Sequence, residues 1–301
     1  MKITCARNAF FAGLILSSFL ISSCATSAAL TDTLSAAGKI AAGAGYSDAG
    51  NVLNAASSAS KAMEEITPES EYYIGRAVAA TVFTNYKPYS SSKQISYLNK
   101  IINTLALNSE GNEPYNGYHV MILDSAEVNA FATSGGHIFV TRGLLAATTS
   151  EDQIAAALAH EMAHVQLQHS LKAIKSSRWT SAGLSVLNAA ANITNAELAS
   201  SMDGMVSDQI STMMNNGYSQ AQEFQADKRA LSILATAGYN PSAMLGMLSQ
   251  LEKIQGSSGS GMFKTHPTPA SRIAKVNEEI KLVPSPADTS SYRKARFASS
   301  K

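Results

Sequence analysis

Two histidines and a glutamate stand at a spacing that suits metal-dependent chemistry. Residues 160–164 are His-Glu-Met-Ala-His, and on an α-helix residues four apart lie about 6 Å apart along the axis and on nearly the same face. Both imidazoles can therefore reach one Zn²⁺ at about 2 Å each. Glu161 lies beside them, where it can take a proton from a water molecule at the metal. His160 and His164 are thus candidate metal ligands, and Glu161 is a candidate general base.

A catalytic zinc ion also needs a third protein ligand and an open position for water. Residues 223–227, Glu-Phe-Gln-Ala-Asp, offer one. Glu223 and Asp227 lie one helical turn apart, so if Glu223 binds the metal, Asp227 can accept the outer ring N–H of a metal-bound histidine. Alone, this acidic pair would suit a solvated helix face. Together with His160 and His164, it predicts one Zn²⁺ per chain, with Glu223 as third ligand.

Helix-start patterns precede both motifs. Ser150 and Gln153 form a capping-box pattern, and the helix that they open is predicted to run to about Lys175. The same pattern at Ser219 opens a second helix, predicted to stop at Gly238. The metal ligands are therefore expected on two helices.

The remaining pattern predicts a mostly helical α+β domain with a small β-sheet, the metal being held between two helices. Apolar spacing predicts helices, β-rich runs predict strands, and a Ser-Gly-Gly cluster predicts a turn. In chain order these are helices over 72–83 and 94–107, strands over 118–123 and 136–140 with a turn at 134–136, and a helical, lid-like segment over 176–216.

The first residues have the pattern of an export signal. Lys2 and Arg7 precede an apolar run over 9–21 that is too short to span a bilayer comfortably. The run ends in Leu-Ile-Ser-Ser-Cys, which resembles the bacterial lipobox, so Cys24 is expected to carry acyl chains. The alternative is an ordinary signal peptide with a chance cysteine. Ala25 follows Cys24 and, by resemblance to enterobacterial lipoproteins, favours the outer membrane.

Four regions follow from these patterns. We expect a lipoprotein signal peptide over 1–23, a lipidated Ala/Ser/Gly-rich tether with short helices over 24–70, a zinc metallopeptidase domain over 71–283 and a flexible tail over 284–301.

Composition excludes several other functions. The two cysteines are Cys5, which is removed with the signal peptide, and Cys24. The mature chain therefore has no thiol pair for a disulfide and no sulfur-ligated metal site. Of 23 basic and 22 acidic residues, Lys2 and Arg7 leave with the signal, which gives a mature net charge of about −1. The sequence has no basic patch with interleaved aromatic residues, so nothing in it suggests a nucleic-acid partner.

Further motifs, taken with these, resemble a known family: gluzincin metallopeptidases related to the CAAX prenyl endopeptidase (peptidase family M48), in their periplasmic lipoprotein branch. The resemblance covers about 72–282 and is carried by residues 129–133, 135–136, 139–145, 160–164, 223–227 and 265–267. The chain departs from the family at Gln220, where Arg is frequent, and has no helical repeats after the peptidase domain. The second departure puts in doubt any partner docking that such repeats perform.

The resemblance implies a metalloendopeptidase of the periplasm, lipid-anchored to the membrane, that cuts unfolded or misassembled envelope proteins. It implies the β-barrel assembly machinery of the outer membrane as a partner. It also implies an edge strand that pairs with an extended substrate through main-chain hydrogen bonds. The residues assigned to this substrate strand are Asn129, Gly136, His137, Ile138 and Phe139.

His266, in a Thr-His-Pro context, is expected by the resemblance to approach the zinc ion. It would either occupy the fourth position as a latch or help to stabilise the oxyanion, and a surface histidine that caps the next helix is the plainer alternative. The Gly- and Ser-rich stretch over 256–261 is expected to let the chain before His266 move, which favours the latch. His119, His137 and His169 are interpreted as surface residues.

Two other classes of function compete with an enzyme. One is a zinc-stabilised, chaperone-like lipoprotein that assists outer-membrane protein assembly without cleavage, and the other is a structural lipoprotein without metal. The chaperone has no use for Glu161, and the structural protein has no use for three convergent ligands, so the sequence favours the enzyme.

Overall fold

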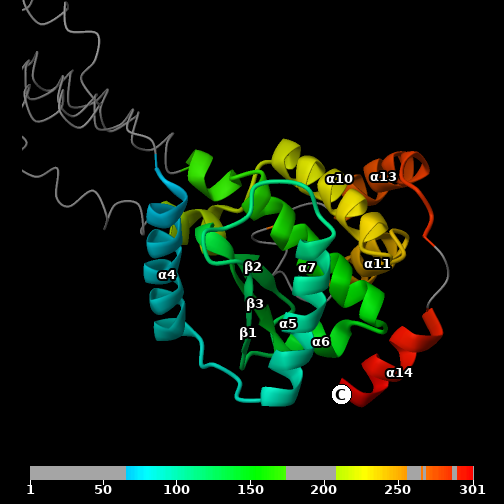
Figure 1. Cartoon of the computed structure of the whole chain (residues 1–301), viewed down its shortest axis with the longest axis horizontal. Helices are drawn as coiled ribbons and strands as arrows, with labels where there is room; N and C mark the ends of the chain where they lie inside the picture. Colours follow the sequence, from blue (N-terminus) through cyan, green and yellow to red (C-terminus); the bar gives the residue numbers. More distant parts are fainter. Residues whose placement is uncertain (1–65, 174–207, 256–265, 267–268, 287–289, 301) are drawn as a thin grey trace, which may run out of the picture. The chain divides into compact units, whose positions relative to one another are not determined.

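Helices dominate the chain and surround one small sheet (Figure 1). The computed structural model describes residues 66–173, 208–255, 266, 269–286 and 290–300, all of which belong to one compact unit. The named elements are α4 Pro68–Asn85, α5 Ser92–Leu107, β1 His119–Leu123, β2 Ala130–Ala132, η1 Ser134–Gly136, β3 His137–Thr141, α6 Arg142–Ala147, α7 Glu151–Gln166, η2 Thr212–Asn216, α10 Gln220–Thr236, α11 Ala243–Gln255, α13 Pro269–Glu279, η3 Ile280–Leu282 and α14 Ser290–Ser300. The predicted α+β class is confirmed.

The sheet has three strands in the order β1-β3-β2. β1 runs parallel to β3, whereas β2 runs antiparallel to β3. Successive side chains of a strand point to opposite faces. Ile138 and Val140 accordingly lie in the core that the sheet shares with α5 and α7, while Phe139 points to the other face, where α4 packs. Both faces of the sheet are therefore covered.

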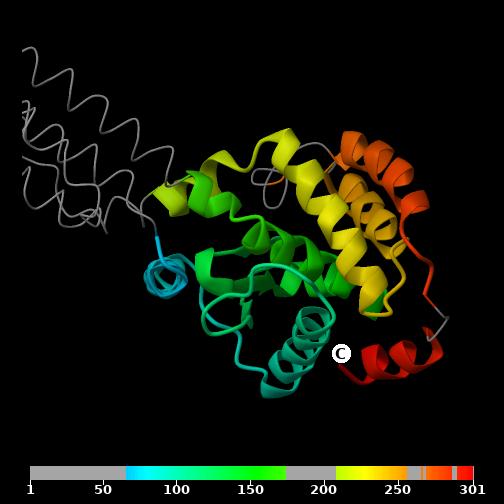
Figure 2. The ribbon, with the colours of Figure 1, turned by 45° about the horizontal axis from the view of Figure 1, so that its top comes forward.

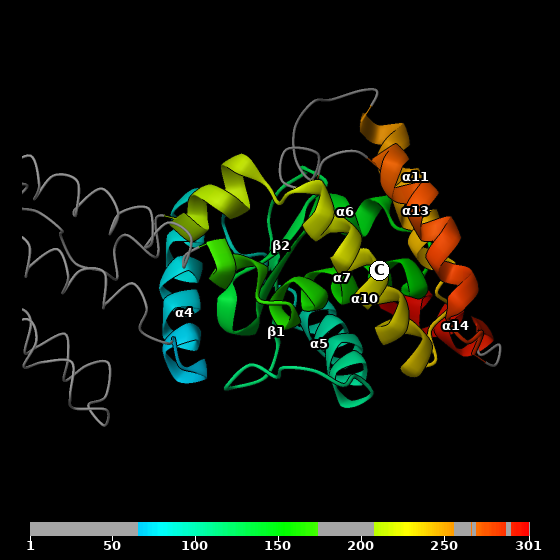
Figure 3. The ribbon, with the colours of Figure 1, turned by 90° about the horizontal axis from the view of Figure 1, so that it is seen from above.

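Helix α7 lies at the centre of the fold. All of its residues except Gln153 are buried, and it contacts α5, α10, α11, α14 and strands of the sheet. A helix that is buried on every side belongs to the core, and the small alanines of α7 allow its neighbours to approach closely. Figures 2 and 3 show α10 beside α7, and α13 packs on both α10 and α11. The α7–α10 pair therefore forms the rigid frame on which the site is built.

Helix α4 meets the turn η1 backbone to backbone. A Cβ on Gly75 would lie 1.7 Å from the carbonyl oxygen of Ser134, and one on Gly135 would lie 2.5 Å from the Cα of Tyr72. Gly135 also has φ 74°, a left-handed conformation that favours glycine. Glycine at both positions is thus what lets α4 close the second face of the sheet.

Most of the predicted elements are present. The helices over 72–83 and 94–107 are confirmed as α4 and α5, and the two predicted strands as β1 and β3. The second capping box is complete at Ser219, and Gly238 follows the end of α10 with φ 77°. The predicted lid over 176–216 lies outside the described residues except for its last turns, which are helical. None of the described helices has the length and apolar character that crossing a membrane requires.

Two boundaries differ from the prediction. The first motif helix, predicted to reach about Lys175, ends as α7 at Gln166, because Gln168 adopts a left-handed conformation with φ 55°. In place of a flexible tail over 284–301, the structure has α14. Buried Arg293 holds α14 in place through Asp152 at 2.8 Å. Composition suggested fraying, but this long-range ion pair outweighs it.

Candidate metal centre

Helix α7 presents two histidines to one point. Ser150 caps the helix by accepting a hydrogen bond from the backbone N–H of Gln153. One turn of helix separates His160 from His164, so their rings lie on the same face. Their Nε2 atoms are 3.0 Å apart, and the two residues are 0% and 2% exposed. Two buried imidazole nitrogens that face each other at this distance can share either one hydrogen or one metal ion.

Helix α10 adds a carboxylate to this pair. Its capping box fixes the helix start, so Glu223 falls in the first turn. Oε2 of Glu223 is 3.5 Å from Nε2 of His160, and Oε1 is 3.4 Å from Nε2 of His164. The packing of α10 on α7 thus brings together residues that are about sixty positions apart in the sequence.

A third imidazole comes from His266, which precedes α13. Its Nδ1 is 2.9 Å from Oε1 of Glu223 and 3.4 Å from Nε2 of His160. His266 is 2% exposed. The ligand atoms of His160, His164, Glu223 and His266 all lie within 4.8 Å of one another.

These spacings fit a tetrahedral metal. Ligands at about 2.0–2.1 Å from a zinc ion lie about 3.3 Å from one another. Five of the six separations among the four side chains run from 2.9 to 3.5 Å, and all lie within 4.8 Å. Nitrogen and carboxylate donors suit a divalent transition metal, and a buried carboxylate among imidazoles benefits from a cation. The residues present therefore fit the metal that the sequence predicts.

Glu161 lies beside the four and has no assigned structural role. It is 0% exposed, and neither of its carboxylate oxygens has a hydrogen-bond partner among the described residues. Nε2 of His266 lies 3.6 Å from its Oε1. A buried carboxylate without hydrogen bonds is destabilising, so its presence needs an explanation. A general base that takes a proton from water provides one.

The outer nitrogen of His160 faces a charged pair. Nδ1 of His160 is 3.0 Å from Oδ1 of Asp227. Arg272 of α13, which is 1% exposed, donates to both oxygens of Asp227 at 2.7 and 2.8 Å and lies 3.0 Å from Oε2 of Glu223. Burial would raise the pKa of Asp227, but Arg272 outweighs it and lowers that pKa to about 2. The carboxylate that backs His160 therefore stays ionised.

The outer nitrogen of His164 faces a neutral group instead. Its Nδ1 is 2.9 Å from Nδ1 of His169, whose Nε2 is 3.2 Å from Oε1 of Gln225. Tyr218 stacks on the His164 ring at 4.1 Å. Burial lowers the pKa of His169 to about 4, so its ring is neutral near pH 7. The interpretation of His169 as a surface residue is wrong, because it is 0% exposed; His119, by contrast, is exposed.

The strand assigned to substrate pairing is also wrong. Gly136 lies in η1, and His137, Ile138 and Phe139 lie in β3, which is hydrogen-bonded on both sides and so cannot be an edge. Among the described strands the edges are β1 and β2. Asn129 leads directly into β2.

The pairing register shows which backbone groups of β2 point away from β3. The C=O of Asn129 accepts from the N–H of Thr141, and the N–H of Thr133 donates to the C=O of His137. In an antiparallel pair such residues alternate with those that point away. Ala130 and Ala132 therefore direct their backbone N–H and C=O groups away from β3.

Sequence reasoning missed Arg272, Tyr218 and Gln225. Arg272 is 45 residues from Asp227 and 49 from Glu223, so no local spacing links them. Gln225 falls within the 223–227 motif but was not given a role. Tyr218 directly precedes the N-cap Ser219, and an aromatic residue there is a weak sign that it packs on the neighbouring helix.

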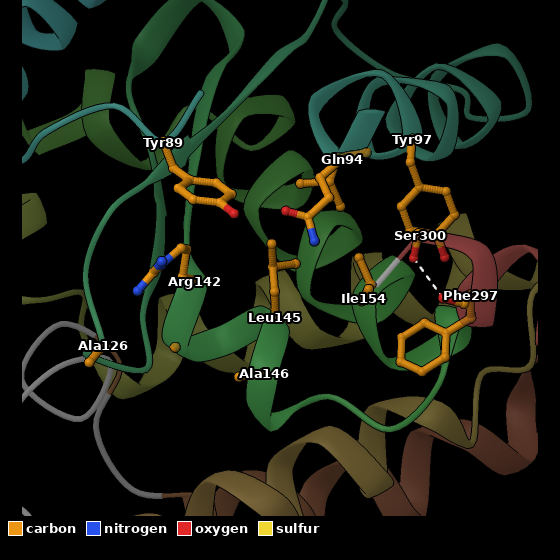
Figure 4. A pocket seen from close by; sticks show the side chains of 12 residues that line it. Tyr89, Gln94, Tyr97, Ala126, Arg142, Leu145, Ala146, Ile154, Phe297 and Ser300 are labelled. Atoms are coloured by element: carbon orange, nitrogen blue, oxygen red, sulfur yellow. Dashed lines mark hydrogen bonds between the residues drawn. The ribbon is translucent and has the colours of Figure 1, made fainter. Parts of the chain in front are cut away.

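A cavity of about 460 Å³ lies away from these residues, between α5, α6, α7 and α14. Figure 4 shows Tyr89, Tyr97, Leu145, Ile154 and Phe297 around it. Its lining includes none of the metal-ligand candidates. The cavity reflects how α14 packs on the domain and takes no part in the site.

Two histidines on one buried helix, a glutamate on the next and a free carboxylate between them define a metal-dependent hydrolase site.

Comparisons with known proteins agree with this class. The model of peptidase family M48 matches residues 92–280. The β-barrel assembly-enhancing protease of Escherichia coli (strain K12) is 28% identical over 193 residues, which cover 59% of this chain and 38% of that protein. The metalloprotease LoiP of the same organism is 30% identical over 191 residues, which cover 64% of this chain and 72% of LoiP. The mitochondrial metalloendopeptidase OMA1 of Schizosaccharomyces pombe is 31% identical over 156 residues, which cover 50% of this chain and 43% of OMA1.

The chain belongs to peptidase family M48, since the family model covers more than half of it. The predicted family is confirmed. The chain spans well under half the length of the β-barrel assembly-enhancing protease that it matches.

Proposed function

We propose that this chain hydrolyses peptide bonds with a zinc ion held by His160, His164 and Glu223. The observation that carries the proposal is the convergence of these ligand atoms within 4.8 Å beside a buried Glu161 that lacks a hydrogen-bond partner among the described residues. Zinc bound there would act as a Lewis acid toward the scissile carbonyl and toward water.

Glu161 performs the proton transfers in this proposal. It accepts a proton from the attacking water and then delivers it to the leaving amine, so the carboxylate is regenerated in each cycle. Asp227 accepts the Nδ1–H of His160 and fixes its tautomer. No covalent intermediate with the protein is needed.

His266 serves as a latch in the resting protein. Its Nδ1 lies 2.9 Å from Glu223 and 3.4 Å from Nε2 of His160, at the place where a fourth ligand would stand. The His266→Ala variant should then raise basal cleavage of an unstructured peptide while zinc stays bound. A fall in turnover with unchanged zinc would favour an oxyanion role instead, and no change in either would make His266 a bystander.

The substrate is an extended segment of an unfolded or misassembled envelope protein, which pairs with the outer edge of β2. The outward backbone groups of Ala130 and Ala132 support this pairing, which is loose in sequence preference because it uses main-chain hydrogen bonds. Asn129, whose Oδ1 is buried without a hydrogen-bond partner among the described residues, stands at the start of that edge.

We further propose that acylated Cys24 anchors the chain to the periplasmic face of the outer membrane, near the β-barrel assembly machinery. The lipobox pattern and the name of the Escherichia coli relative support this setting, although Cys24 lies outside the described residues. The Cys24→Ser variant should lack acyl chains and leave the membrane fraction. An acylated, membrane-bound Cys24→Ser protein would contradict the anchor.

The enzyme proposal is tested by metal content and casein degradation, each measured before chelation, after chelation and after zinc is restored. We expect about one zinc per chain and cleavage that is lost and regained with it. The His119→Ala variant, which removes an exposed histidine, is the control and should match the wild type. Stoichiometric zinc without cleavage would instead indicate the chaperone-like lipoprotein.

A further inference from the structure

We propose that His169 is a positioning residue for the metal ligand His164: it accepts the Nδ1–H of His164 and thereby turns the Nε2 lone pair toward the metal. The inference rests on the proposed metal site, and it adds a residue to which neither the motif nor the family comparison gives a role. The two Nδ1 atoms are 2.9 Å apart, and both rings are buried.

The hydrogen-bond chain has only one consistent set of protons. If Nε2 of His164 offers its lone pair to a metal, its Nδ1 must carry the proton. Nδ1 of His169 must then accept, so the proton of His169 sits on Nε2. That Nε2–H donates to Oε1 of Gln225 at 3.2 Å. Gln225 therefore fixes the tautomer of His169, and His169 fixes that of His164.

The backbone is shaped to make this contact. In an uninterrupted α-helix, residues five apart are rotated by about 140° around the axis and do not face each other. Here α7 ends at Gln166, Gln168 adopts φ 55°, and helical structure resumes at 169–173. Gln168 is the only non-glycine residue with positive φ among the described residues. Strained backbone of this kind persists where the surrounding structure enforces it, and its effect is to return His169 to His164.

Tyr218 completes the support from the other side. Its ring stacks on His164 at 4.1 Å with an angle of 23° between the planes, while His169 meets the edge of that ring at 73°. Stacking alone does not distinguish the two orientations of the His164 ring that a 180° flip about χ2 exchanges. The hydrogen bond to His169 selects the orientation in which Nε2 faces Nε2 of His160.

The test compares variants that keep or remove the acceptor. In His169→Asn, Oδ1 replaces Nδ1 as an acceptor at a similar place, whereas His169→Phe keeps a ring and removes the acceptor. Zinc affinity is measured in the full chain by competition with a chelator, and the visible absorption of the cobalt-substituted protein reports ligand geometry. We expect His169→Phe to weaken zinc binding by about 10- to 100-fold and to alter the cobalt spectrum. The His169→Asn variant should stay near the wild type, and so should the control His119→Phe.

Two outcomes overturn the inference. One is a His169→Phe protein that binds zinc as tightly as the wild type with an unchanged cobalt spectrum. The other is a His169→Asn protein that loses as much affinity as His169→Phe, because the ring rather than the acceptor would then matter. If His169→Phe does not fold, Gln225→Leu decides: weaker zinc binding than in His169→Asn supports the relay, and wild-type binding contradicts it. All of these readouts are independent of cleavage, so an inactive but zinc-binding wild type would defeat the proposed function alone.

Discussion

The two histidines of α7 are held from behind by different chemistry. His160 faces Asp227, which is paired with buried Arg272. His164 faces neutral His169, which is paired with Gln225, and Tyr218 stacks on its ring. One support is ionic and comes from α10 and α13, whereas the other is uncharged and comes from the chain just after α7 and from α10.

The two supports differ in the free energy of burying them and in what is lost when one partner is removed. A buried ion pair is expensive to desolvate and fails badly when one partner is lost. A neutral hydrogen-bond chain costs less to bury, but it depends on each tautomer being fixed. An anionic partner also makes its histidine more basic, while a neutral partner mainly orients it. We therefore expect losses on the His160 side to appear in folding stability and losses on the His164 side to appear in metal affinity.

Removing any one of the three proposed ligands should abolish zinc binding, whichever support it belongs to. In His160→Ala, His164→Ala or Glu223→Ala, only two of the three proposed zinc ligands remain, and two ligands hold zinc poorly. Metal content after dialysis should fall from about one zinc per chain to near zero in all three. Near-stoichiometric zinc in Glu223→Ala would show that the third ligand lies elsewhere, with His266 the first residue to test.

Loss of the ionic support of His160 should lower the free energy of unfolding. In Asp227→Ala, buried Arg272 loses its bidentate partner, and removal of one member of a buried pair costs about 3–5 kcal/mol. Urea unfolding in the presence of a chelator measures this without the metal. The matched control is Lys228→Ala, which removes the exposed partner of Glu279 between the same two helices and should cost less than about 1 kcal/mol. Equal effects would refute the ionic account of this side.

A second charged contact, at the other end of α7, sharpens the same point. Arg293 is buried against Asp152, whereas the Arg296 side chain, paired with Glu151, is 56% exposed. The Arg293→Ala variant should lose about 1.5–3 kcal/mol, because buried Asp152 loses its charged partner and its Oδ2 loses a hydrogen bond, while its Oδ1 still accepts from the backbone N–H of Asn240. The Arg296→Ala variant should lose less than about 1 kcal/mol. Thermal unfolding compares the two, and the reverse order would mean that exposure does not govern these pairs.

The smallest effects concern the turn that supports the neutral side. Gln168→Gly and Gln168→Asn suit a left-handed backbone and should change the free energy of unfolding by less than about 0.5 kcal/mol, with zinc affinity retained. The β-branched Gln168→Val should destabilise by more than about 1 kcal/mol and weaken zinc binding, since His169 is displaced. If Gln168→Val binds zinc normally, the turn has no link to His164.

Local signals explain what the sequence predicted well. The caps at Ser150 and Ser219 and the spacing of His160 and His164 depend on residues within one or two turns. Such short-range rules are readable without knowledge of the fold. They predicted the helices that carry the site and the side chains that face one another across it.

The failures all depend on contacts that are distant in the sequence or on one unusual residue. Which strand is the edge is set by the pairing of β3 with both neighbours, and strand propensity says nothing about it. His169 was misplaced because nothing in the residue type of Gln168 announces a left-handed turn. The tail was misread because Arg293 finds Asp152 at a separation of 141 residues.

The assignment of Glu161 as the general base is tested most directly by one variant. Metal content and cleavage of an unstructured peptide are measured side by side in the wild type and in Glu161→Gln. Because only the proton acceptor changes, we predict about one zinc per chain and unchanged folding in both proteins, with cleavage reduced by about 10²- to 10⁴-fold in Glu161→Gln. Cleavage by Glu161→Gln at the wild-type rate, with zinc still bound, would contradict the mechanism.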